Sequence, residues 1–434
     1  MPLYKRLPHG PHRLARNEVI RNQRTRIHGA MVEAVAENGY EGTSVKQVIG
    51  LAGVSRRSFY EQFANKEECF LATFDLLADR GLQRVSRAYL EARGGLEGRL
   101  RAALGEFAET AASEHKAAVL VIVESQMAGA AGLLRLRRAT TRCEQLLSRG
   151  FVESQHTSPL PTPIVRGIAG GLHGALSARL RDGGSSEVDD FAEEMLRWTL
   201  LFQTPAAERM AEQAAARLSR HVRDVSIANG YDPVDAEPPS EDARERLLHN
   251  VLRLSVIDDY RELTAPQIAE EAGVSINAFF ELFDGKNECF LAALDMLGDE
   301  LLAIAADPGL VSSDWPQAVR RVIGELMRYL ADHPLYAQTI AQQAFVAGAD
   351  AVQRNLELAH GIATLLTEGA PEEARCGLAL EGVAGAIWHT VRCQVTGGRI
   401  QLLPALSDYL AYVVLAPFIG ADAAVEAVTE DCVV

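Results

Sequence analysis

Two adjacent arginines, Arg56 and Arg57, directly follow a serine that is a favourable N-cap for a short helix. Side chains near the start of such a helix reach base edges when the helix lies in a DNA major groove, and arginine pairs bidentately with guanine. Tyr60 and Lys66 follow closely, and their hydroxyl and ammonium groups suit phosphate oxygens. These residue types at this spacing predict a DNA-binding segment.

The residues around the arginines carry the start and stop signals of a helix-turn-helix. Residues 24–40 place apolar side chains on one helix face. Ser44 lies three residues before Gln47, the pattern of a capping box for a second helix that Gly53 ends. Ser55 then caps a third helix. The residues predicted to contact DNA are Arg24, Arg26, Thr43, Ser44, Ser55, Arg56, Arg57, Ser58, Tyr60 and Lys66.

The same block occurs twice in the chain. A shift of 220 residues aligns AGVSRRSFYEQFANKEECFLA, from Ala52, with AGVSINAFFELFDGKNECFLA, from Ala272, without a gap. Weaker matches follow in the same order at shifts of 219 and 215 residues. Ordered matches at a nearly constant shift indicate that a whole unit of about 190 residues is duplicated.

The segments that precede the two blocks differ in charge. From Met1 to Arg26, seven Lys and Arg residues oppose a single glutamate, a net charge of +6. From Tyr231 to Arg246, six acidic residues oppose two arginines, a net charge of −4. A basic arm can follow the DNA backbone or enter the minor groove, so this difference predicts that the first copy binds DNA more strongly.

The second recognition helix also lacks the arginines. It has Ile276 and Asn277 in their places, and Phe280 in place of the tyrosine. Asn277 can pair with adenine and Lys286 can hold a phosphate, so these two residues are the candidates for DNA contact in the second copy.

Residues 43–70, TSVKQVIGLAGVSRRSFYEQFANKEECF, resemble the DNA-binding signature of the tetracycline-repressor (TetR/AcrR) family of regulators. The resemblance is carried by Ala52-Gly53-Val54-Ser55, the aromatic pair Phe59-Tyr60, Phe63 and Lys66-Glu67-Glu68. It implies an all-α fold, in which three short N-terminal helices precede a larger helical body. That body is expected to hold an inducer pocket, and its last two helices to form a dimer-making four-helix bundle.

The repeat and the resemblance together predict two tandem TetR-like units. We expect a helix-turn-helix domain at residues 20–68 and a helical regulatory domain at 69–204. A linker helix and an acidic, proline-rich linker are expected at 205–240. A second, divergent helix-turn-helix is expected at 241–288, followed by a second regulatory domain at 289–425.

Polar residues in the apolar bodies are the candidates for effector binding. His389 and Cys393 are one helical turn apart, which would suit a metal or thiol sensor. Because no further ligand lies nearby in the sequence, we interpret them as a packed core pair and predict no metal site and no cofactor. The candidate effector-binding residues are Glu124, Gln126, His173, Gln342, Gln343, Trp388 and His389.

The sequence therefore predicts a transcriptional regulator that binds double-stranded operator DNA, most simply a repressor. A small apolar or amphipathic effector is expected to shift the helix that begins at Lys66 and so lower operator affinity. The alternative is a ligand- or partner-binding scaffold with relic helix-turn-helices. The two units can pair within one chain as a pseudo-dimer, or two identical chains can pair as a homodimer.

The composition of the chain and the motifs that it lacks argue against other functional classes of protein. Apolar residues make up 48% and charged residues 23%, as in ordinary globular proteins, and the net charge of −15 opposes general affinity for polyanions. No phosphate loop, H-E-x-x-H or nucleophile elbow occurs, so no enzymatic activity is expected. The N-terminus lacks an apolar segment, and the apolar run at 410–420 is short and contains Pro417. We expect a cytoplasmic protein without membrane contact.

Overall fold

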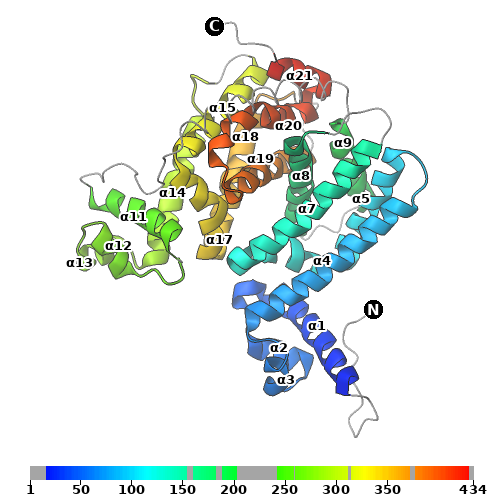
Figure 1. Cartoon of the computed structure of the whole chain (residues 1–434). Helices are drawn as coiled ribbons and strands as arrows, with labels where there is room; N and C mark the ends of the chain where they lie inside the picture. Colours follow the sequence, from blue (N-terminus) through cyan, green and yellow to red (C-terminus); the bar gives the residue numbers. More distant parts are fainter. Residues whose placement is uncertain are drawn as a thin grey trace.

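The computed structural model is built from helices, and the residues that it describes contain no β-strand (Figure 1). This confirms the predicted all-α fold. The basic arm up to residue 15 and the predicted linker lie outside the described part of the chain. The described residues are 16–153, 160–181, 188–202, 242–258, 260–310, 314–371 and 377–429.

The first head consists of α1 (Arg16–Gly42), α2 (Val45–Ala52) and α3 (Arg56–Tyr60). The helices begin at the predicted caps. Ser44 and Gln47 form the capping box of α2, and the Ser55 side chain accepts a hydrogen bond from the Ser58 amide at the start of α3. Gly53 ends α2 with φ 58°, a left-handed conformation that favours glycine. The apolar core of the head contains residues from α1, α2, α3 and the start of α4, and Leu120 and Ala128 of the following body complete it.

The second head, α11 (Ala243–Ile257), α12 (Ala265–Glu271) and α13 (Ile276–Leu282), repeats this construction. The Thr264 amide donates to Gln267 Oε1 at 2.9 Å, and the Ser275 hydroxyl accepts the Ala278 amide. Across residues 51–60 and 271–280, each pair of aligned positions falls in the same class of buried, half-buried or exposed residue. The two heads therefore have the same fold, although most of their aligned residues differ.

Each head is followed by a helical body, and the helices of the two bodies correspond in order. In Figure 1 the first head lies at the bottom and the second at the left. The first body contains α4 (Lys66–Glu91), α5 (Leu96–Ser113), α6 (His115–Ile122), η1 (Glu124–Ala128), α7 (Gly129–Glu153), α8 (Thr162–Arg181) and α9 (Val188–Leu201).

The second body begins with α14, which corresponds to α4. Residues 339–343 form a single π-helical turn. Its helices are α14 (Lys286–Ala305), α15 (Trp315–Asp332), α16 (Pro334–Gln338), η2 (Thr339–Gln343), α17 (Ala344–Ala347), α18 (Ala349–Thr367), α19 (Gly377–Thr396), η4 (Ile400–Leu402), η5 (Pro404–Leu406), α20 (Ser407–Ile419) and α21 (Ala421–Thr429).

The two bodies share one apolar core, centred on α8 of the first body and α19 of the second. Glycines allow the two backbones to approach closely. A Cβ atom at Gly385 would lie 2.4 Å from the Gly170 carbonyl oxygen, and one at Gly174 would lie 2.8 Å from the Glu381 carbonyl oxygen. Side chains larger than hydrogen are excluded at these positions. Helix α8 of the first unit and helix α19 of the second thus pack together within one chain.

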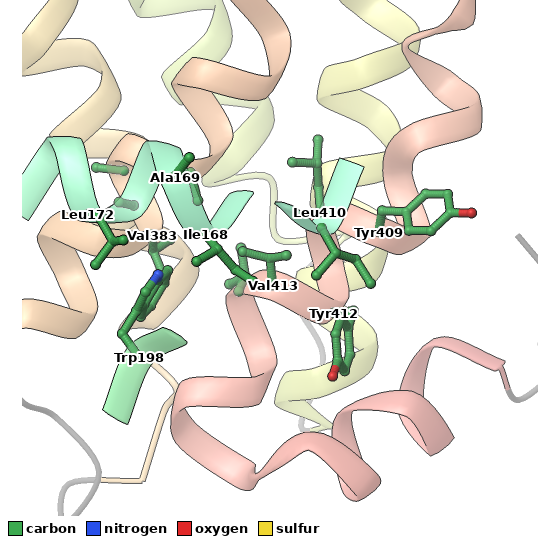
Figure 2. Packing of buried hydrophobic residues seen from close by; sticks show 14 of the residues in the cluster. Ile168, Ala169, Leu172, Trp198, Val383, Tyr409, Leu410, Tyr412 and Val413 are labelled. Carbon is green, nitrogen blue, oxygen red and sulfur yellow. The ribbon is translucent and has the colours of Figure 1, made fainter. Parts of the chain in front are cut away.

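Helices α9 and α20 complete this contact. Figure 2 shows Trp198 of α9 beside Leu172 and Val383, and Val413 of α20 close to Ile168. The Trp198 ring also contacts Phe202, which in turn contacts Tyr412, with ring centroids 5.5 Å and 5.7 Å apart. These aromatic contacts join the first body to α20 and add to the apolar area buried between the bodies.

The apolar run near the C-terminus is longer than the sequence analysis predicted. In the described part of the chain, one helical segment, Ile400–Ile419, is long and apolar enough to cross a bilayer, with a mean hydropathy of 1.7. The bent pair His115–Ile122 and Glu124–Val152 passes the same test only if both helices are taken as one span. Because 61% of Ile400–Ile419 is buried against other helices, it serves as a core element of the joined bodies.

Candidate nucleic-acid interface and effector cavities

The outer surface of α3 presents both predicted base-reading arginines. The Arg57 side chain is 88% exposed and pairs with Glu61, with Nε and Oε1 2.9 Å apart. The Arg56 guanidinium lies 5.7 Å from the ring centre of Tyr60, which is itself 44% exposed. Phe59, on the opposite side of the helix, is fully buried. The head core therefore fixes α3 with its cationic face toward solvent.

Two other predicted DNA contacts have a local structural role. Arg26 donates to the carbonyl oxygens of Ala52 and Gly53, which ties α1 to the turn before α3. Lys66 Nζ donates to the Tyr40 carbonyl oxygen at 2.9 Å and lies 4.3 Å from the Tyr40 ring centre. These bonds hold the recognition helix relative to the other helices of the head.

The second head keeps these same anchoring bonds. Arg246 Nε donates to the Ala272 carbonyl oxygen at 2.9 Å, and Lys286 Nζ donates to the Tyr260 carbonyl oxygen at 2.8 Å. Lys286, a predicted phosphate ligand, thus has the same role as its counterpart in the first head. Anchoring explains why these two cations are present in both copies while the arginine pair is not.

The remaining predicted contacts divide by exposure. Arg24, Ser44 and Ser55 are exposed, Ser58 is half-buried, and the Arg24 guanidinium lies 5.1 Å from the Phe63 ring centre. The Thr43 side chain is buried, only 3% exposed, and donates to the Gly39 carbonyl oxygen at 2.7 Å. The prediction that the Thr43 side chain contacts DNA is therefore wrong, because its hydroxyl is used inside the head.

The corresponding surface of the second head is largely apolar. Ile276, Phe280 and Leu282 are 38%, 54% and 39% exposed, and Asn277 is exposed beside them. This surface offers one polar base-reading side chain where the first head offers two guanidinium groups.

An apolar cavity of about 200 Å³ lies inside the first body. Its walls come from α4, α5, α6, α7 and α8, with Leu104, Phe107 and Leu147 among the lining residues. Arg84, at its edge, pairs with Glu106 at 2.6 Å and with Glu114 at 3.2 Å. Such a cavity suits a small apolar or amphipathic molecule.

The same position in the second body is filled. Gly81 lines the first cavity, and a Cβ atom there would meet nothing within 4 Å. The aligned residue, Leu301, is 2% exposed and belongs to the shared core. Arg84 likewise aligns with Ile304, which packs against that core. The second unit thus has a buried leucine where the first has a glycine at the cavity wall, and an apolar residue where the first has the arginine at the cavity edge.

A second cavity, of about 400 Å³, lies between the bodies. Four predicted effector-binding residues line it: Gln126 and His173 from the first body, and Trp388 and His389 from the second. Burial, followed by the charge of Arg392, lowers the pKa of His173 to about 3, so this imidazole is neutral at pH 7.

The other three predicted ligand residues do not line either of these cavities. Glu124 Oε2 accepts the Tyr40 amide at 2.7 Å, so Glu124 joins η1 of the body to the first head. Burial raises the pKa of this carboxyl group. Gln342 and Gln343 lie in the π-helical turn η2. These three residues lie in the helical bodies, as the sequence predicted, but the structure does not place them on the wall of either cavity.

His389 and Cys393 have a third polar partner that sequence reasoning missed. A hydrogen bond of 2.9 Å joins His389 Nε2 to Oε1 of Glu144, a residue of α7. Cys393 Sγ lies 3.5 Å from the same nitrogen. Burial alone would raise the pKa of Cys393, but its hydrogen bond to His389 and the charge of that residue outweigh burial and lower it. Glu144 is 245 residues from His389, so no local pattern could have linked them.

A comparison with known protein families finds a match at each of the two heads. The family model described as bacterial regulatory proteins, tetR family, matches residues 29–73 and 253–293. These are the segments that form the two helix-turn-helix heads. The chain thus carries the DNA-binding domain of the tetR family of bacterial regulatory proteins twice. No curated protein sequence matches the chain.

Three solved structures are similar to part of the chain. The fatty acid degradation regulator FadR from Bacillus halodurans has a TM-score of 0.36 and 20% identity, covering 40% of this chain and 96% of that one. FadR from Bacillus subtilis, in complex with stearoyl-CoA, has a TM-score of 0.37 and 18% identity, covering 40% and 96%. A TetR family regulator from Marinobacter aquaeolei has a TM-score of 0.35 and 20% identity, covering 42% and 97%.

Proposed function

We propose that this regulator is a repressor that binds operator DNA mainly through its first head and is released by a small effector. The observation that carries the proposal is the exposed pair Arg56 and Arg57 on α3, above a buried head core. Two exposed guanidinium groups at the start of a recognition helix have the chemistry to pair with guanine. A scaffold with relic heads would gain nothing from keeping this pair.

The proposed functional unit is one chain, with the two units paired as a pseudo-dimer. The close approach of α8 and α19 supports this arrangement, because these helices use each other as partners. We retain 20–68 and 241–288 as the bounds of the two heads. Unlike heads fit an operator with two unlike half-sites. Light scattering is expected to give one chain mass, 47.1 kDa, and twice that mass would contradict a single-chain unit.

The cavity of the first body is the proposed effector site. Helix α4 supports this role because its early residue Lys66 anchors the head, while Leu77 and Val85 further along line the cavity. An effector that displaces α4 would therefore shift the recognition helix. A coupling of about 1–3 kcal/mol, or 5- to 150-fold in operator affinity, is enough for regulation.

The test compares operator affinities by fluorescence anisotropy, using DNA selected from a random library by the wild-type chain. Each guanine pairing contributes about 1–3 kcal/mol, so Arg56→Ala/Arg57→Ala is expected to weaken binding at least about 30-fold. Arg87→Ala is the matched control, because Arg87 is also exposed and also pairs with a glutamate four residues on. Unchanged binding by the double variant would show that α3 is not the reading helix.

A further inference from the structure

The cluster of Glu144, His389 and Cys393 brings together three different metal-ligating side chains from two units. Glu144 belongs to α7 of the first body, whereas His389 and Cys393 lie one turn apart on α19 of the second. One ligand atom from each residue lies within 4.8 Å of the other two. His389 and Cys393 are buried, 4% and 5% exposed, so the cluster is shielded from solvent.

We propose that this cluster is a binding site for a thiophilic divalent cation of the Zn²⁺ type. One sulfur, one imidazole nitrogen and one carboxylate oxygen are donors that Zn²⁺ accepts. In a tetrahedral zinc site with ordinary bond lengths, neighbouring ligand atoms lie about 3.4–3.6 Å apart. Glu144 Oε1 and Cys393 Sγ lie 2.9 Å and 3.5 Å from His389 Nε2, and all three ligand atoms lie within 4.8 Å of one another, so small side-chain movements would bring them to that distance.

Two of the three ligands can carry the negative charge that a divalent ion needs, although the buried Arg392 also lies close to His389 and Cys393. A Cys393 thiolate and the Glu144 carboxylate together balance two positive charges. Arg166 Nε lies 3.8 Å from Glu144 Oε2, while the other carboxylate oxygen faces His389. Arg166 thus holds one carboxylate oxygen of Glu144 and leaves the other facing His389, where the metal would bind.

The neighbouring cavity provides access to the cluster. His389 lines the cavity of about 400 Å³ between the bodies, so a water molecule can reach the fourth coordination position. His173 lines the same cavity, and its Nε2 is buried without a hydrogen-bond partner. A polar atom left in this state indicates that the cavity holds a polar species.

Metal binding would join the two units, since the ligands come from both. An ion held by α7 and α19 fixes the bodies relative to each other beside the close contact of α8 with α19. The site is independent of the apolar cavity in the first body, and its existence does not depend on DNA binding.

The test uses the full chain, freed of metal with a chelator under reducing conditions and titrated with Co²⁺. The expected result is one equivalent bound, with the charge-transfer absorption of a cobalt–thiolate bond, and displacement of that absorption by Zn²⁺. Cys393→Ser should abolish the absorption. Glu144→Gln keeps the shape of the side chain, and should weaken binding at least about tenfold, the usual minimum for loss of a supporting or ligating group.

Cys143→Ser is the matched control, because Cys143 is adjacent to Glu144 in sequence and lies outside the cluster. It should leave the absorption unchanged. The proposal is overturned if the wild-type chain shows no cobalt–thiolate absorption, or if the absorption survives Cys393→Ser. It is also overturned if Glu144→Gln binds Co²⁺ as tightly as wild type, an outcome that can be read even if the cysteine variant fails to fold.

Discussion

The two heads have the same core and different surfaces, whereas the two bodies differ in their cores. In the heads, aligned residues such as Phe59 and Phe279 are both fully buried, while Arg56 and Ile276 are both exposed. In the bodies, Gly81 of the first leaves a cavity that Leu301 of the second fills. Duplication has thus preserved the scaffold of the head while changing its reading surface, and has preserved the helix order of the body while changing its interior.

The difference between the bodies predicts the largest effects. Leu301→Ala should destabilise the chain by about 2–5 kcal/mol, because it leaves a void in the shared core. Gly81→Leu should cost little stability, since the side chain enters open space, but it should reduce binding of an apolar fluorescent probe at least tenfold. Urea unfolding and probe titration measure the two effects.

Gly105→Leu is the control for the cavity prediction. A Cβ atom at Gly105 also meets nothing within 4 Å, yet the residue does not line the cavity. Probe binding should survive this change. Equal loss of probe binding in both glycine variants would mean that the probe does not occupy the cavity of the first body.

A buried histidine of the first head is replaced by leucine in the second, which predicts an acid sensitivity at this position of the first head alone. His28 in the first head is 6% exposed and lies 2.7 Å from the Thr73 hydroxyl, whereas the aligned residue in the second head is the buried Leu248. Burial, followed by the charge of Arg24, lowers the pKa of His28 from 6.5 to about 4. Between pH 6.5 and about pH 4, the imidazole is therefore neutral in the folded head but protonated in the unfolded chain.

The stabilisation from neutral His28 is present above pH 6.5 and is lost as the pH falls from 6.5 to about 4. The loss should be on the order of 3 kcal/mol, from the size of the pKa shift. His28→Leu, which copies the second head, should remove most of this pH dependence. Urea unfolding of both chains at pH 7 and pH 4.5 measures it, and an undiminished acid sensitivity in the variant would assign the effect to other groups.

The difference between the recognition helices predicts a gain of function. Ile276→Arg/Asn277→Arg gives the second head the arginine pair of the first on the same backbone. Operator affinity should rise about tenfold or more on DNA carrying two copies of the first half-site, because each guanine pairing contributes about 1–3 kcal/mol. Anisotropy at two salt concentrations should also show a steeper salt dependence. No gain would indicate that the second head cannot reach the duplex.

The fold of the heads was predictable because their signals are local. Ser44 and Gln47, Gly53 and Ser55 each specify a helix end through neighbours within a few residues, and the structure contains these ends as predicted. The roles of Arg26 and Lys66 were less accessible. A cation at the surface of a helix-turn-helix suggests phosphate binding, and only the folded head shows that both bind backbone carbonyl oxygens.

The candidate site in the bodies was predicted only in part. Gln126, His173, Trp388 and His389 do line one cavity, as expected from polar residues in apolar helices. Glu124 instead bonds to the first head, because the 3₁₀ turn that contains it passes close to the Tyr40 amide. Helical periodicity gives the face of a helix, but it does not say which neighbour covers that face.

By itself the sequence determined that two units of the same family are joined, that each begins with a helix-turn-helix, and that the first carries the positive charge. These properties depend on residue types, on short spacings within each block of about fifty residues, and on the recurrence of that block 220 residues later. Only the tertiary structure shows that α8 and α19 pack together and that Glu144 contacts His389 and Cys393. It also shows that Gly81 lines a cavity in the first body, whereas the aligned Leu301 is packed in the shared core. Each of these depends on close packing between residues far apart in the chain, and packing follows from shape and volume that no local pattern encodes.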